Sequence, residues 1–126
     1  MKSLLQTVAI SVTLCATSAL AFDPDDLQKL KDTGNCVGCD LEGADLSVMR
    51  LKDSNLAGSN LKGANLTLAY LLRANLKGAD LSWSSLNGAN LAGADLTGAN
   101  LDWARTRDAI ICDTIMPNGS SERRRC

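Results

Sequence analysis

Leucine recurs at every fifth position of this chain, without a break, from Leu41 to Leu101. A small residue, alanine or serine, stands two positions before most of these leucines, and the residue between is usually Asp or Asn. A period of five matches neither the two-residue period of a β-strand nor the 3.6-residue period of an α-helix. A fixed internal period instead predicts a solenoid, in which each repeat buries its apolar side only against neighbouring repeats.

The repeat unit reads Ala-Asp-Leu-x-Gly or Ala-Asn-Leu-x-Gly, as in the segment from Gly93 to Leu101. Over residues 39–111 this pattern resembles the A(D/N)LxX motif of the pentapeptide-repeat family. The resemblance implies an all-β solenoid, a right-handed quadrilateral β-helix in which four repeats make one square coil. The leucine and the small residue then point inward. At twenty residues per coil, Leu41–Ile111 gives about 3.5 coils and a rod of roughly 17 Å. Met49 at a small position predicts local swelling, and Thr106 at a leucine position predicts a looser end.

Residues 1–21 have the features of a secretory signal peptide. They contain Lys2, an apolar stretch over residues 4–14, and Ala19-Leu20-Ala21 as a small-x-small cleavage site. The stretch is too short and too polar for a membrane anchor. We therefore expect an exported protein in the periplasm or outside the cell, or in the thylakoid lumen of a phototroph.

The predicted mature chain begins at Phe22 and is nearly neutral. Removal of Lys2 leaves 12 basic residues against 14 acidic ones, and the chain has no histidine. This balance gives no argument for binding to nucleic acid or to a membrane surface.

A short helix is predicted before the repeats. Asp23 is a good N-cap, Pro24 suits the first helical position, and Gly34 is a good end. Leu27 and Leu30 share one face, which can cover the open top of the first coil. An uncovered end would leave unpaired backbone groups and invite end-to-end association. The helix is therefore predicted to be a cap.

Four cysteines remain after the predicted cleavage, Cys36, Cys39, Cys112 and Cys126, and four allow three pairings. The rod places the first two and the last two near opposite ends, too far apart for a disulfide. The predicted pairs are therefore Cys36–Cys39 and Cys112–Cys126, and the second would pin the tail over the bottom coil. Both cysteine pairs resemble those of exported bacterial and thylakoid-lumen members of the family. The predicted organisation is a signal peptide at 1–21, an N-terminal cap at 22–38, the solenoid at 39–111 and a C-terminal cap at 112–126.

The spacing of Cys36-Val37-Gly38-Cys39 also occurs in thioredoxin-like proteins, so thiol redox chemistry is an alternative. Cys39 occupies an inward position of the first repeat, which favours a structural disulfide. Asp40 stands where a haem-attachment motif has histidine, and a four-cysteine zinc site would need both ends of the rod to meet. The acidic and amide residues before the leucines form stacked columns, but their regular spacing predicts turn-forming side chains rather than acid–base pairs. We predict no enzyme activity, no metal and no cofactor.

Large residues at outward positions are the candidates for an interface. Trp83 and Trp103 lie twenty residues apart and should stack on one corner, either under the terminal cap or as a contact site. A second group gathers around one edge near Tyr70. Exposed apolar clusters mark interfaces, where Trp, Tyr and Arg are favoured. The predicted interface residues are Val48, Arg50, Leu68, Tyr70, Leu72, Trp83 and Trp103.

These features predict a rigid, non-catalytic scaffold that presents flat faces to a protein partner, whose identity the sequence does not reveal. Apolar edges and capped ends are also compatible with a side-by-side homodimer. Some cytosolic members of the family resemble DNA and bind DNA gyrase, which gives a second hypothesis. The near-neutral charge, the short rod and the signal peptide disfavour gyrase binding. Thiol redox chemistry at Cys36 and Cys39 is the third.

Overall fold

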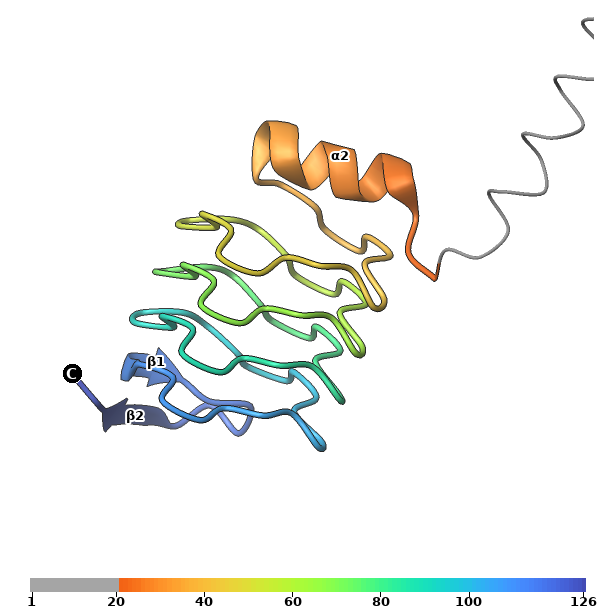
Figure 1. The fold of residues 1–126 in the computed structure, drawn as a ribbon. Helices are drawn as coiled ribbons and strands as arrows, with labels where there is room; N and C mark the ends of the chain where they lie inside the picture. The colour runs from red at the N-terminus through yellow and green to blue at the C-terminus, as the bar shows by residue number, and fades with distance from the viewer. Residues whose placement is uncertain (1–20) are drawn as a thin grey trace, which may run out of the picture.

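The computed structural model describes residues 21–126, so all but the last residue of the predicted signal peptide lies outside the described residues. The described chain winds into stacked coils that share one axis (Figure 1). Parallel backbone bridges join residues twenty apart, in series from Asn35 to Asn55, Asn75, Asp95 and Ile115. Four such steps make the solenoid about half a coil longer than the segment Leu41–Ile111 that the leucine pattern defined.

Hydrogen bonds between coils satisfy the backbone. Between the second and third coils, for example, Leu61 N–H donates to the Asp80 carbonyl at 2.8 Å and Gly63 N–H donates to the Ser82 carbonyl at 2.8 Å. A tight turn also closes within each repeat, as where Ala64 N–H donates to the Leu61 carbonyl at 3.0 Å. The backbone is therefore paired mainly with the coils above and below, as a solenoid requires.

The core is a column of leucines interleaved with small residues. Every repeat leucine from Leu41 to Leu96 is at most 2% exposed. The hydroxyls of the inward Ser59 and Ser84 donate to carbonyls of the preceding leucines, Leu56 at 2.7 Å and Leu81 at 2.6 Å. These bonds make a polar side chain tolerable at a buried position.

The two irregular inward positions behave differently. Met49 is half-buried and packs against the core, so a long side chain fits at the edge of a small-residue position. Thr106 is exposed and Leu101 is only half-buried. The shaft therefore loosens at its C-terminal end, in agreement with the expectation from Thr106.

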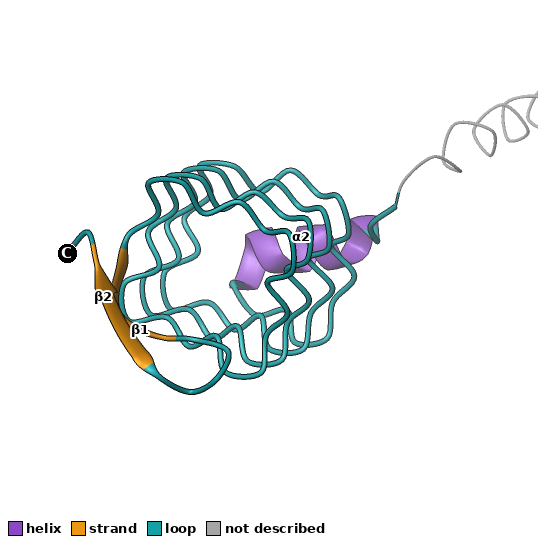
Figure 2. Cartoon of the chain, turned by 90° about the horizontal axis from the view of Figure 1, so that it is seen from below, coloured by secondary structure: helices purple, strands orange, loops and turns teal. Residues whose placement is uncertain are grey.

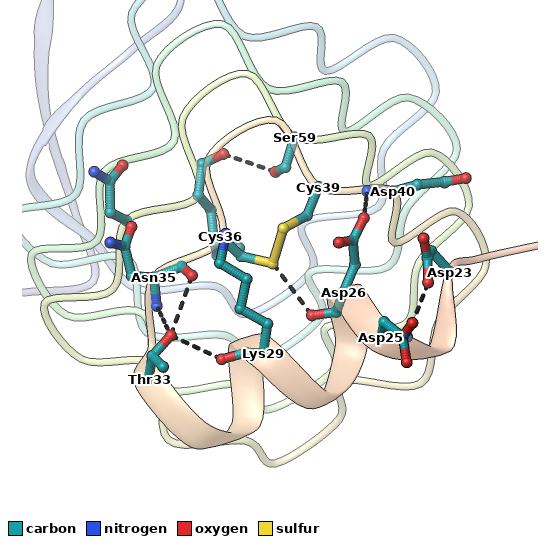
Figure 3. The surroundings of a disulfide bond; sticks show 12 residues. Asp23, Asp25, Asp26, Lys29, Thr33, Asn35, Cys36, Cys39, Asp40 and Ser59 are labelled. Carbon is teal, nitrogen blue, oxygen red and sulfur yellow. Dashed lines mark hydrogen bonds between the residues drawn. A yellow bond between two sulfur atoms is a disulfide. The ribbon is translucent and has the colours of Figure 1, made fainter.

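Helix α2, Pro24–Thr33, lies across the top of the first coil (Figure 1). The Asp23 side chain accepts the Asp25 N–H at 2.8 Å, and Gly34 ends the helix at φ 66°. The Asp26 carboxylate accepts the N–H of Asp40 at 2.8 Å and ties the helix to the first coil (Figure 3). Leu30 is 1% exposed and belongs to the core, so the predicted short helix is present and its apolar face packs against the first coil.

The C-terminal segment forms a hairpin. Strand β1, Ile111–Ile115, pairs antiparallel with β2, Ser121–Arg124, and Cys112 is bonded to Cys126. Strand β1 continues one wall of the solenoid, and β2 lies along its outer edge (Figure 2). The tail, expected over the bottom coil, pairs with this one wall only.

Candidate interaction surfaces

A shallow hollow forms on one edge of the rod. Val48, Arg50, Lys52, Leu68 and Tyr70 line about 520 Å³, and we call it the Tyr70 groove. The three apolar members are 67%, 59% and 40% exposed, in the order Val48, Leu68 and Tyr70. The arrangement follows from the coil, because residues twenty apart stack and place Val48 beside Leu68 and Arg50 beside Tyr70.

The structure brings together four of the five residues that the sequence analysis placed at this edge. The fifth, Leu72, is half-buried and does not line the hollow. Lys52 lines it instead, one coil before Leu72. The sequence contains the information that places Lys52 here, because Lys52 and Leu72 are twenty residues apart and therefore lie in one column.

The groove contains two cationic side chains. Within residues 21–126, neither Arg50 nor Lys52 forms an ion pair. The neighbouring Arg73, in contrast, donates to both carboxylate oxygens of Asp53 at 2.8 and 3.1 Å. This hydrogen bond lowers the pKa of Asp53 and raises the pKa of Arg73. The groove therefore combines exposed apolar surface with two available cations.

The exposed apolar residues occupy strained corners of the coil. Val48, Leu68, Trp83 and Trp103 have φ values of 60°, 58°, 61° and 61°, in the left-handed region. Glycine fills about half of the equivalent corners, for example Gly63 at φ 66°, and charged residues such as Asp53 fill others. A side chain in this conformation costs roughly 1–3 kcal/mol, and a β-branched residue such as valine is especially rare there. The backbone of the coil does not explain these four side chains, because glycine meets its needs at lower cost.

Trp83 and Trp103 form the predicted stack. Their ring centroids are 5.5 Å apart and their planes differ by 16°. They are also 58% and 74% exposed, so the C-terminal segment does not bury them. Each ring covers one face of the other, and the rest of the pair is open to contact.

The disulfides follow the predicted pairing, Cys36–Cys39 and Cys112–Cys126. Cys36 and Cys39 are 0% and 4% exposed, and the helix α2 lies over them (Figure 3). Thiol exchange requires access to a sulfur atom. This burial favours a structural role over redox chemistry in the folded protein. Cys126, in contrast, is exposed.

The acidic columns serve the turns. Asp45, Asp80 and Asp95 each accept both the backbone N–H and the side-chain hydroxyl of the residue two positions later. The hydroxyl bonds, from Ser47, Ser82 and Thr97, are 2.6 Å long. In each case this hydroxyl bond is the main reason why the pKa of the carboxyl is below its ordinary value. A general acid at neutral pH needs a raised pKa, so these carboxyls do not fit that role, and their bonds fit turn formation.

Residues 21–126 contain no group of three or more metal-ligating side chains. No helix in that range has the length and apolar character needed to cross a bilayer.

Comparison with known proteins points to one family. The family model described as "Pentapeptide repeats" matches residues 35–71 and 74–110, in eight copies. A pentapeptide repeat protein from Nostoc PCC 7120 is 26% identical with a TM-score of 0.55, and the match covers 84% of this chain and 90% of that one.

This chain matches less than two thirds of the length of two other solved structures. QnrB1, a plasmid-mediated fluoroquinolone resistance protein, is 23% identical with a TM-score of 0.56, over 59% of this chain and 39% of that one. This match shows the fold alone. A pentapeptide repeat protein from the Arabidopsis thaliana thylakoid lumen is 34% identical with a TM-score of 0.34, over 64% of each chain. A search of curated proteins found no significant match.

Proposed function

Because the chain belongs to the pentapeptide-repeat family, whose fold is a right-handed quadrilateral β-helix, we propose that it is a non-catalytic, exported scaffold that binds a protein partner. The proposed contact surface is the Tyr70 groove. One observation carries this assignment: three exposed apolar side chains and two unpaired cations share one hollow of a rigid coil.

The non-catalytic role is supported by how the polar side chains are used. The hydroxyls of the inward Ser59 and Ser84 donate to backbone carbonyls, and the aspartates of the columns bond to their own turns. The remaining inward positions are mostly leucine and alanine. Surface recognition on a fixed template accounts for this composition without a chemical step.

The groove suits a partner segment with an apolar side chain next to a carboxylate. Val48, Leu68 and Tyr70 would bury the apolar group, and release of water from such a patch favours association. Arg50 and Lys52 would pair with the carboxylate, which speeds encounter and disfavours basic partners. The stacked coils fix these side chains before binding, which lowers the entropic cost of association.

Leu68→Gly tests the groove with little risk to the fold. Glycine suits the corner at φ 58°, so the stability should be unchanged or slightly higher while partner binding is lost. The measurement is quantitative mass spectrometry of proteins cross-linked to the tagged chain in its native host. Asp113→Gly is the control, since it changes another non-glycine residue at positive φ, 52°, outside the groove, and removes only an exposed ion pair with Arg123. Partners recovered equally by the wild type and Leu68→Gly would reject the groove as the contact surface.

Export is the second part of the proposal. Two disulfides in a small chain support an oxidising compartment, which would be the periplasm, the cell exterior or the lumen of a thylakoid. The protein recovered from its native host should therefore have the intact mass of residues 22–126, less four hydrogen atoms for the two disulfides. A full-length, fully reduced mass would contradict export and reopen gyrase binding and thiol chemistry.

A further inference from the structure

On two sides of the last coil, four backbone N–H groups have no acceptor among residues 21–126. One coil earlier, the N–H groups of Leu81, Trp83, Leu86 and Gly88 donate to carbonyls of the following coil, at 2.6 to 2.9 Å. The equivalent groups of the last coil belong to Leu101, Trp103, Thr106 and Asp108. Within residues 21–126 these four donate to no acceptor. They form an exposed β-edge, which is a template for pairing with another strand.

The two ends of the rod differ in this respect. The helix α2 lies over the first coil, whereas β2 pairs only with β1 on one wall of the last coil (Figures 1 and 2). The unpaired donors lie in the segment 101–108, which precedes β1. The C-terminal end is therefore the end at which a further strand can be added.

Side chains at the same end also lack their next neighbours. Leu101 is half-buried, although Leu41, Leu61 and Leu81 of its column are fully buried. Trp103 stacks on Trp83 with one ring face, and its 74% exposure leaves the other face free. An added strand would cover Leu101 with an apolar residue and could stack an aromatic ring on Trp103.

The segment 101–108 contains Asp102 and Asp108, of which Asp108 pairs with Arg125 at 3.2 Å, and two arginines that share one hollow. Arg105 and Arg107, with Asn87 and Thr106, line a hollow of about 470 Å³. Neither arginine forms an ion pair within the described part of the chain. An acidic segment meets them with opposite charge.

We infer that the C-terminal end of the solenoid is a strand-addition site for an extended, acidic segment of a partner protein that carries an aromatic residue. The backbone of the segment bends once at the Trp103 corner, as each coil does, and so pairs with residues 101–108 on both sides; its aromatic ring stacks on Trp103, and its carboxylates contact Arg105 and Arg107. The site is separate from the Tyr70 groove and does not depend on the function proposed for it.

The probe is a phage-displayed library of random linear dodecapeptides, panned against the oxidised full chain. We expect enriched peptides with one aromatic residue beside Asp or Glu. Binding of the best synthetic peptide should weaken at least about tenfold in Trp103→Gly and in Arg107→Glu. Val48→Gly, a corner change in the Tyr70 groove, is the matched control and should bind normally. Trp103 is exposed and its corner suits glycine, so the variant should fold, as circular dichroism will check.

Backbone pairing has its own readout. Methylation of single peptide nitrogens should abolish binding at alternating positions, and hydrogen exchange at Leu101, Trp103, Thr106 and Asp108 should slow when the peptide binds. Failure to enrich peptides would overturn the inference, as would equal binding to Trp103→Gly and Arg107→Glu, or tolerance of methylation at every position. A stable dimer in light scattering, with these four amides protected without peptide, would show that a second copy occupies the edge and would also overturn it.

Discussion

Replacing Leu66 with alanine is expected to lower the free energy of unfolding by about 2–5 kcal/mol. Leu66 is 0% exposed and lies between Leu46 and Leu86 of the same column, which are also fully buried. Each coil is fixed by hydrogen bonds to both neighbours, so the walls cannot easily close on the space that the leucine leaves. The loss should appear in chemical denaturation followed by circular dichroism.

Leu101→Ala is the matched control for this experiment. The residue type and the repeat position are the same, but Leu101 is only half-buried at the open end. We expect a loss about half as large, because less apolar surface is buried and solvent can fill the space. Equal losses at the two positions would mean that the last coil is more closely covered in solution than the hairpin β1–β2 allows.

Removing the Cys112–Cys126 bond is the second change with a large expected effect. Cys112→Ser with Cys126→Ser should lower the free energy of unfolding by about 3 kcal/mol, on the loop-entropy estimate for a separation of 14 residues. Serine should be tolerated at both sites, since Cys126 is exposed and Cys112 is half-buried. The measurement is again chemical denaturation, under oxidising conditions that keep Cys36–Cys39 intact.

The wild type provides a check on the same bond. Mild reduction of the folded protein, followed by alkylation and peptide mapping, should label Cys112 and Cys126 first. Cys36 and Cys39 are buried beneath α2 and should react only after the cap opens. Labelling of Cys36 and Cys39 first would contradict a structural role for that pair.

Much of the fold could be predicted because one short motif repeats with the same burial at each copy. The leucine period fixed which residues point inward, and the cap residues Asp23, Pro24 and Gly34 defined α2. The disulfide pairing followed once a rod separated the two cysteine pairs. The hairpin was not predictable in this way, because Ser121–Arg124 lacks the period and its polar residues give no inward face.

The strain at the corner residues was also missed, although the sequence contains its signal. The second position after the repeat leucine is glycine in about half of the repeats, and this identifies the corner at which φ is positive. Val48, Leu68, Trp83 and Trp103 stand at the same position and must share its conformation. Their outward direction could be predicted from the repeat. Their energetic cost could be predicted only by noting that they occupy the same repeat position as the glycines and therefore have the same positive φ.

The pairing of residues twenty apart also limits how such a rod can change in length. Inserting twenty residues adds a complete coil and leaves every downstream column in its place. Inserting five turns all downstream residues by one quarter of the square, which would remove Trp103 from the column of Trp83 and place the hairpin on a different side. Inserting any number that is not a multiple of five moves leucines out of the shaft. Length variation in this rod is therefore confined to whole repeats, and only whole coils preserve the relative orientation of surfaces at its two ends.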